Sequence, residues 1–545
     1  MLVTNRYKIF LFKLIAVFAV VFFFIAIELV VRWISPVNIA ADDLINIGNL
    51  SFFTPITHKG ENYIKITNKY GYPDQHVMFR KKKHTNTIRI FCIGGSACAG
   101  WPHPMDERFS SYLQTYLQKI YPFQKFEVIN CAAHGFASYR VRKVFQALLP
   151  YQPDAVIVWC GNNEFLEDRK YISSGFGKIV DHFAGKIKTV QVLKHLFSKP
   201  QLNGNELNVS NAFWKKVQQE SLELRSNPKL FDKVKFHYRS SLEKIAEEAS
   251  ANGIKTLFFT VPVNLKDWEP NVSYCSLKGA DSVEWARKVL DGRSFLFKND
   301  LTNAKDKFLD AIEHESLHAH SYFWLARVYD ALNDSVTALK NYSIARDLDY
   351  NPFRAISDFN QIVKKIAVQH QDAYLFDADS LFKANSIRGI PGFDLFLDYV
   401  HPTRFGNILL AVNLGKYIRQ KDLFNIKSPS VLMDQKEFET SLSDYSDEKD
   451  VKLQITRFSL FCLTHQYISS LNLGKWILSI LPESYLNDSS NQHELQKLKD
   501  GIEAFSMFCA ADENVLSKRD KKEEMQHAKL MVKKFYERYY PYGSY

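Results

Sequence analysis

Short segments rich in Val, Ile or Phe alternate with helix-like segments through the middle of the chain, and this alternation constrains the fold most. The strand-like segments lie at 87–93, 126–131, 154–160, 254–261 and 373–376, and the helix-like ones at 109–120, 139–149, 230–251, 360–369 and 403–416. Nearly continuous apolar character is typical of strands buried on both faces of a parallel sheet. We therefore expect right-handed β-α-β crossovers and an α/β fold with a doubly wound parallel sheet.

A repeat with a period of 34 residues interrupts this pattern between 285 and 352. Gly292 matches Ala326, and Phe308 matches Tyr342. Small residues at such places let two antiparallel helices approach closely, and aromatic residues fill the space between them. The pattern resembles the tetratricopeptide repeat and predicts an inserted helical hairpin region. An unrelated helical hairpin is the alternative.

The N-terminal segment predicts a membrane anchor. Residues 14–31 are apolar except for Glu28, and the 18 positions rise roughly 27 Å, enough for a bilayer core. Basic residues precede the segment, which places the N-terminus in the cytoplasm and the rest of the chain outside. We expect an uncleaved signal anchor that crosses the membrane once. A cleaved signal peptide is the alternative, although a small-residue cleavage site is poorly defined.

Composition excludes several classes of protein. The net charge of +11 is spread along the chain, which argues against a nucleic-acid interface. Seven cysteines without a C-x-x-C pair argue against a disulfide scaffold and a structural zinc site. We expect neither a cofactor nor a metal.

The chain accordingly divides into an anchor, a stalk, one interrupted α/β domain and a helical end. The predicted bounds are 1–36 for the anchor, 37–86 for a polar stalk, 87–278 for the first part of the α/β domain with an insertion at 164–228, 279–352 for the repeats, 353–425 for the last part of the α/β domain, and 426–545 for a helical C-terminal region. We assign no chemistry to this last region.

Candidate catalytic residues follow the predicted strands. Ser96 ends a G-G-S turn after the first strand, Gly135 follows the second, Asn163 follows the third, and Asp398 and His401 lie near the end of the α/β domain. In an open parallel sheet, ligands bind at the carboxyl ends of the strands. The set predicts acyl transfer: a serine nucleophile, a histidine base, and an aspartate that orients the base. The Ser96 and Gly135 amides and the Asn163 side chain would form the oxyanion hole.

These residues resemble the serine, glycine, asparagine and histidine blocks of the GDSL/SGNH hydrolase superfamily. The third block reads G-N-N-E where G-x-N-D is commoner, and Gly95 stands where the family usually has Asp before Ser96. The resemblance covers 87–165, 229–275 and 353–420. The chain is also similar to a bacterial branch of the superfamily that has a membrane anchor and tetratricopeptide repeats. The resemblance implies a serine esterase, which we expect to be a single-pass protein of a bacterial inner membrane that faces the periplasm. From this location we infer that the substrate is an acylated carbohydrate or lipid-like envelope component, and we expect the repeats to be available to a protein partner. An envelope O-acyltransferase and a non-catalytic scaffold are the alternatives.

Simpler interpretations exist for these positions. Ser96 could only cap a helix, and Asp398 with His401 could form a surface turn. Asn163 could satisfy local backbone groups, and Gly135 could serve only a turn. Cys98, two residues from the serine, is expected to pack in the core as free cysteines usually do.

Overall fold

The computed structural model describes residues 52–66, 78–166, 222–426, 433–517 and 522–539, together with isolated positions between 15 and 30. The chain divides into two compact units, and the larger one comprises 55–66, 72–168 and 208–545. Most of the predicted anchor and most of the 164–228 insertion lie outside the described residues. Within those that are described, no helix combines the length and the apolar character that a membrane span requires.

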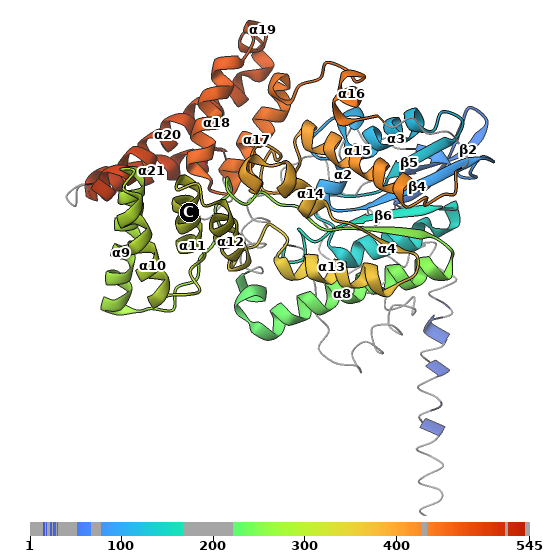
Figure 1. Ribbon diagram of the computed structural model, residues 1–545, viewed down its shortest axis with the longest axis horizontal. Coiled ribbons are helices and arrows are strands. Elements are labelled where there is room, and N and C mark those ends of the chain that lie inside the picture. The colour runs from blue at the N-terminus through green and yellow to red at the C-terminus, as the bar shows by residue number, and fades with distance from the viewer. Residues whose placement is uncertain are drawn as a thin grey trace, which may run out of the picture. The chain divides into compact units, whose positions relative to one another are not determined.

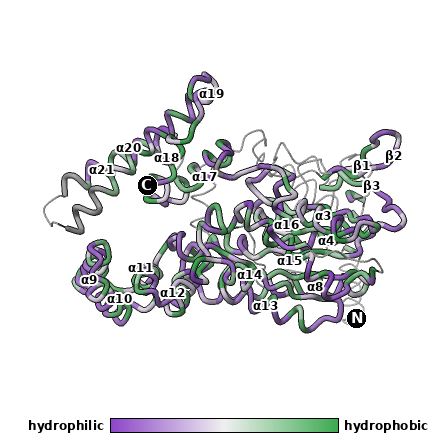
Figure 2. Tube along the Cα trace, turned by 45° about the horizontal axis from the view of Figure 1, so that its top comes forward, coloured by the Kyte–Doolittle hydropathy of each residue, from purple (hydrophilic) through white to green (hydrophobic). Residues whose placement is uncertain are grey.

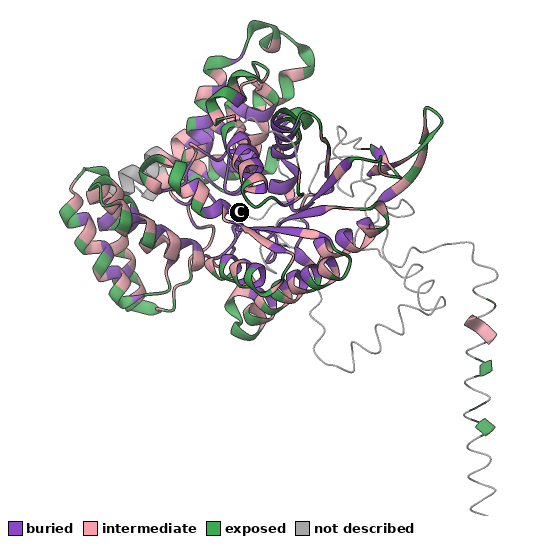
Figure 3. Cartoon of the chain, turned by 45° about the vertical axis from the view of Figure 1, so that its right-hand side comes forward, coloured by how far each residue is buried: buried purple, intermediate pink, exposed green. Residues whose placement is uncertain are grey.

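A five-stranded parallel sheet forms the centre of the larger unit, as the sequence predicts (Figure 1). Its order is β5-β4-β6-β7-β8, with β4 at Thr87–Gly94, β5 at Lys125–Asn130, β6 at Ala155–Trp159, β7 at Lys255–Phe259 and β8 at Ala373–Phe376. Every residue of β6 is buried, which explains its uninterrupted apolar sequence, and Figure 3 shows the sheet as the buried centre of the domain. This order has a topological switch point between β4 and β6.

Helices cover both faces of the sheet, so the doubly wound arrangement is confirmed (Figure 1). On one face α3 (Phe109–Ile120) packs against α15 (Arg404–Gln420), and on the other α8 (Pro228–Ala251) packs against α4 (Ser138–Leu148) and α13 (Ser357–Gln369). Helices α3, α4 and α13 each bury one stripe of apolar residues, as the 3.6-residue period requires.

A second, smaller sheet lies within the segment predicted as a polar stalk, and that prediction is wrong for these residues. Its strands are β1 (Phe53–His58), β2 (Glu61–Ile66) and β3 (Met78–Arg80), with β2 and β3 antiparallel. The Phe79 ring packs edge-on against Phe91 and Tyr151, and the Arg89 guanidinium donates to the Arg80 carbonyl. Residues 78–80 therefore dock on the α/β domain.

The repeat region forms four consecutive helices that pack on one another: α9 (Gly279–Phe297), α10 (Leu301–His314), α11 (Ala319–Ala331) and α12 (Ser335–Asp347). A Cβ atom at Gly292 would lie 2.9 Å from the Phe308 ring, so the small residue permits the close approach of α9 and α10. The period also recurs in the caps, because Asp300 and Asp334 accept backbone bonds at the starts of α10 and α12. Membership of the tetratricopeptide family stays a prediction.

The C-terminal region is helical, as predicted. It contains α16 (Gln435–Thr440), α17 (Val451–Leu463), α18 (Tyr467–Ile480), α19 (Glu483–Leu486), α20 (Gln492–Ser517) and α21 (Lys522–Tyr539). Polar and apolar residues alternate along these helices (Figure 2).

Candidate active site

The structure brings Ser96, His401 and Asp398 into one hydrogen-bonded line. His401 Nε2 lies 2.8 Å from Ser96 Oγ, and His401 Nδ1 lies 2.6 Å from Asp398 Oδ2. A carboxylate can only accept, so Nδ1 carries the proton and Nε2 offers its lone pair to the serine hydroxyl. Asp398 is fully buried and His401 is 3% exposed, while Ser96 is half-buried. These are the positions and partners that a serine nucleophile and its base need.

A tight turn between β8 and α15 holds the histidine and the aspartate. Asp398 Oδ1 accepts the backbone amides of Val400 and His401 at 2.8 and 2.9 Å, which leaves Oδ2 for the imidazole. The Leu397 amide donates to the His401 carbonyl at 2.8 Å, and Asn264 Nδ2 donates to the Asp398 carbonyl at 2.9 Å. Hydrogen bonds to the backbone of residues 397, 398, 400 and 401 therefore fix this turn.

Aromatic rings and a neutral histidine surround His401. The Trp101 and Tyr399 rings meet it edge-on, with centroids 4.6 and 5.8 Å from that of the imidazole. Burial, helped by the nearby His401 and Arg108, lowers the pKa of His134 to about 3. His134 is thus uncharged at neutral pH, and it adds no second cation beside the base.

The serine loop contains two glycines whose surroundings leave little room for a side chain. A Cβ at Gly94 would lie 2.0 Å from the Trp159 carbonyl oxygen, and a Cβ at Gly95 would lie 2.5 Å from Asn163 Nδ2. Ser96 follows as the first residue of α2 (Ser96–Ala99), where a backbone amide has no helical acceptor. The Asp that the resembled family usually has at position 95 therefore has no room while Asn163 stays in place.

The three predicted oxyanion donors come from loops after neighbouring strands. Asn163 is 8% exposed, lies against Gly95, and donates one amide hydrogen to the Phe136 carbonyl at 3.2 Å. A carboxamide has two such hydrogens, so one remains. Gly135 is exposed and has a φ of +70°, a conformation that favours glycine. The donor roles of Ser96, Gly135 and Asn163 stay predictions.

Glu164 is a structural residue that the sequence analysis missed. Its carboxylate accepts the Ser138 amide at 2.7 Å and the Ser138 hydroxyl at 2.9 Å, at the start of α4. The loop that carries Asn163 is thereby tied to α4. An acid at the end of the third block, with a serine at a predicted helix start, was the available signal.

The cysteines near the site are buried, which confirms the expectation that they pack. Cys92, Cys98, Cys131 and Cys160 are all buried free thiols. Burial raises the pKa of the Cys98 thiol well above its ordinary value, so it is held as a thiol and is a poor nucleophile. Within the described ranges, no group of three or more His, Cys, Asp or Glu side chains could hold a metal ion.

The C-terminal region, to which the sequence analysis assigned no chemistry, also contacts the histidine turn. Arg457 Nε donates to the Leu397 carbonyl at 2.8 Å, and Asp447 accepts the Arg404 amide at 2.7 Å. His103, which follows the serine loop in the chain, also contacts the turn: its Nε2 lies 2.8 Å from the Pro402 carbonyl oxygen and donates a proton to it. Three side chains from distant parts of the chain thus support this turn.

Comparisons with known proteins give low similarities. No known family model matches the chain, and no curated protein matches it. Among solved structures, the chain is similar to TesA (14% identity, TM-score 0.25, 62% of this chain and 99% of that one). It is also similar to a GDSL-like lipase from Bacteroides thetaiotaomicron (11%, 0.28, 61% and 88%) and to a catalytic mutant of Axe2, an acetylxylan esterase from Geobacillus stearothermophilus (12%, 0.27, 61% and 93%). Because these scores are low, the function proposed below rests on the geometry of the site.

Proposed function

We propose that the protein is a serine ester hydrolase of the SGNH type, with Ser96 as nucleophile, His401 as base and Asp398 as the group that orients the base. The supporting observation is the continuous line from Ser96 Oγ through His401 to a fully buried Asp398. A bare surface turn or a helix cap would not need an imidazole between a hydroxyl and a buried carboxylate.

The reaction proceeds in two steps. Ser96 Oγ attacks the acyl carbonyl while His401 Nε2 takes the hydroxyl proton, and His401 then gives that proton to the departing alcohol. A water molecule, deprotonated by the same nitrogen, attacks the acyl-enzyme, and the proton returns to Ser96 as the acid leaves. The Ser96 and Gly135 amides and the remaining Asn163 hydrogen stabilise the oxyanion in both steps.

The location and substrate are part of the same proposal. An uncleaved N-terminal anchor at 14–31 holds the hydrolase on the periplasmic side of the inner membrane, and the substrate is an acylated carbohydrate or lipid-like component of the envelope. The repeat helices are available there to a protein partner. A phosphatase fused to the C-terminus that stays inactive in intact cells would exclude this orientation.

A fluorophosphonate probe tests the nucleophile directly. We expect the full-length protein to be labelled and to hydrolyse p-nitrophenyl acetate, and Ser96→Ala to lose both properties. Cys98→Ser is the matched control, because it changes a neighbouring buried thiol and leaves the line of three residues intact. Labelling that survives Ser96→Ala, or is lost only in Cys98→Ser, would exclude Ser96 as nucleophile. Ester cleavage that requires an added sugar acceptor would identify a transferase instead.

A further inference from the structure

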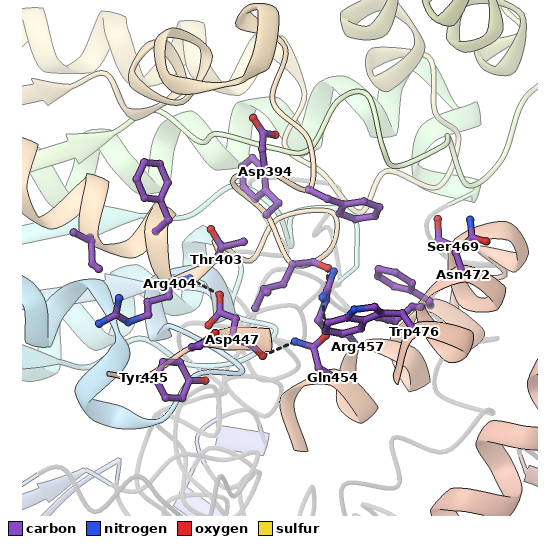
Figure 4. A pocket seen from close by; sticks show the side chains of 18 of the residues that line it. Asp394, Thr403, Arg404, Tyr445, Asp447, Gln454, Arg457, Ser469, Asn472 and Trp476 are labelled. Carbon is purple, nitrogen blue, oxygen red and sulfur yellow. Dashed lines mark hydrogen bonds between the residues drawn. The ribbon is translucent and has the colours of Figure 1, made fainter. Parts of the chain in front are cut away.

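A cavity of about 760 Å³ lies between the histidine turn and the C-terminal helices, and Ser96, Asp398 and His401 do not line it. Its walls come from residues 393–397 and 403–408 on one side and from α16, α17, α18 and the 445–447 segment on the other (Figure 4). Ligand sites typically measure about 300–1,000 Å³, so this cavity has room for a short chain of small units.

One face of α18 presents unused hydrogen-bonding groups to the cavity. Ser469, Asn472 and Trp476 are spaced three and four residues apart, so they lie on the same side of the helix. In the described part of the chain, none of these three side chains forms a hydrogen bond, although each carries a donor. Arg457 adds another donor, because its Nε and Nη1 are used by Leu397 and Gln454 while Nη2 has no bond among the described residues.

The charges and rings of the lining define the chemistry of the occupant. Three carboxylates and two guanidinium groups line the cavity, so their charges nearly cancel and a strongly anionic ligand has no excess of cations to meet it. Trp476 is half-buried, and Phe405 is 43% exposed. Aromatic faces beside hydroxyl, amide and indole groups suit a sugar ring, which has one apolar face and an equatorial belt of hydroxyls. Charged and polar side chains lie between the apolar ones, which disfavours a lipid chain.

We propose that this cavity binds a neutral oligosaccharide, which makes it a carbohydrate subsite beside the proposed active site. The inference builds on the proposed ester hydrolase by naming a carbohydrate as its substrate class. The site is connected to the histidine turn by two hydrogen bonds: Arg457 Nε to the Leu397 carbonyl, and the Leu397 amide to the His401 carbonyl. An oligosaccharide held here would therefore lie against the turn that carries the base.

Binding to a variant without turnover tests the proposal. Full-length Ser96→Ala is titrated calorimetrically with the tetrasaccharides of xylose, mannose and N-acetylglucosamine, and separately with tetragalacturonate and palmitate. We expect at least one neutral tetrasaccharide to bind, and Trp476→Ala and Asn472→Ala in this background to weaken binding by about tenfold or more, the loss typical of a polar or aromatic contact that the ligand covers. Phe236→Ala is the matched control, because Phe236 is an aromatic residue 59% exposed on α8, outside the cavity.

The outcomes separate the subsite from the esterase. No binding of any neutral tetrasaccharide, binding that ignores both cavity variants, or binding of only the acidic sugar or the fatty acid would each overturn the proposal. Asn472 is exposed, so its truncation leaves the fold intact even if Trp476→Ala unfolds α18. Binding by Ser96→Ala would stand even if the wild-type protein hydrolysed no ester, whereas ester hydrolysis without sugar binding would refute only the subsite.

Discussion

Replacing Gly95 by alanine should disable the oxyanion hole without unfolding the protein. The added Cβ would lie 2.5 Å from Asn163 Nδ2, whereas ordinary contacts lie at 3.4–4 Å, so the amide must retreat by about 1 Å. The next atom that the Cβ meets, the Phe136 carbonyl oxygen, is already at 3.5 Å. Because the obstacle is the end of a side chain, the backbone need not move.

The expected changes in stability and in kcat follow from the hydrogen bonds that Asn163 would lose. Its bond to the Phe136 carbonyl contributes about 1 kcal/mol to stability, so Tm should fall by only a few degrees. Loss of one oxyanion donor typically lowers kcat by about 10²–10³, or roughly 2.7–4 kcal/mol of transition-state stabilisation. Gly94→Ala is the contrasting variant: its Cβ would lie 2.0 Å from the backbone oxygen of Trp159, and we expect it to prevent folding.

A double-mutant cycle with p-nitrophenyl acetate as substrate measures the coupling. Gly95→Ala and Asn163→Ala should each lower kcat by similar factors, and the double variant should be no slower than Asn163→Ala alone. Wild-type kcat in Gly95→Ala would refute the reasoning. A further tenfold loss from Gly95→Ala in the Asn163→Ala background would show that position 95 acts through Ser96 and not through the amide.

Three other changes test separate parts of the structure. Asp398→Asn should lower kcat about 10⁴-fold with little change in Tm, because the new amide donates to the imidazole and leaves the proton on Nε2. With p-nitrophenyl acetate, which is too small to need the cavity contacts, Arg457→Met should lower kcat about tenfold at constant KM. It should also move the acid limb of the pH profile to higher pH, because a cation near Asp398 is removed, and Arg457→Lys should restore the limb. Burial lowers the pKa of His318 to about 4, and its unprotonated Nδ1 accepts the Ser321 amide at the start of α11. As the pH falls, the unfolded chain therefore binds this proton before the folded chain does. The contribution of His318 to stability is complete above about pH 6.5, and about 1–2 kcal/mol of it is lost by pH 5. In His318→Asn, which keeps a cap but cannot titrate, the Tm difference between pH 7.5 and pH 5 should shrink; an unchanged difference would refute the assignment.

The strands of the α/β domain could be predicted because buried parallel strands are continuous apolar runs. The segment predicted at 373–376 is β8, and the helix predicted at 109–120 is α3. The helix expected from Thr403 begins one residue later, because Thr403 is its N-cap and accepts the Gly406 amide. Apolar periodicity and helix capping depend on residues that are neighbours in the sequence, so the sequence alone shows them.

The small sheet could not be predicted on the same basis. In β2, Glu61 and Asn62 are exposed and only Ile64 and Ile66 are buried, so charged residues break the apolar pattern. Its partner strand β3 packs through Phe79 against Phe91, and such a contact between distant segments cannot be read from either segment alone.

The candidate site shows the same division between local and distant information. Residue types and spacing were enough to predict roles for Ser96, Asp398 and His401, because a hydroxyl, a carboxylate and an imidazole each have a distinct chemistry. The reason for Gly95 was not available from the sequence, because it lies in the Asn163 side chain, which follows a different strand. Arg457 was invisible for a similar reason: its guanidinium reaches a backbone carbonyl 60 positions away, and any carbonyl presents the same acceptor. The helical C-terminal region thus contacts the turn that carries the proposed base, and the kcat of Arg457→Met measures how far this contact sets the geometry of the turn.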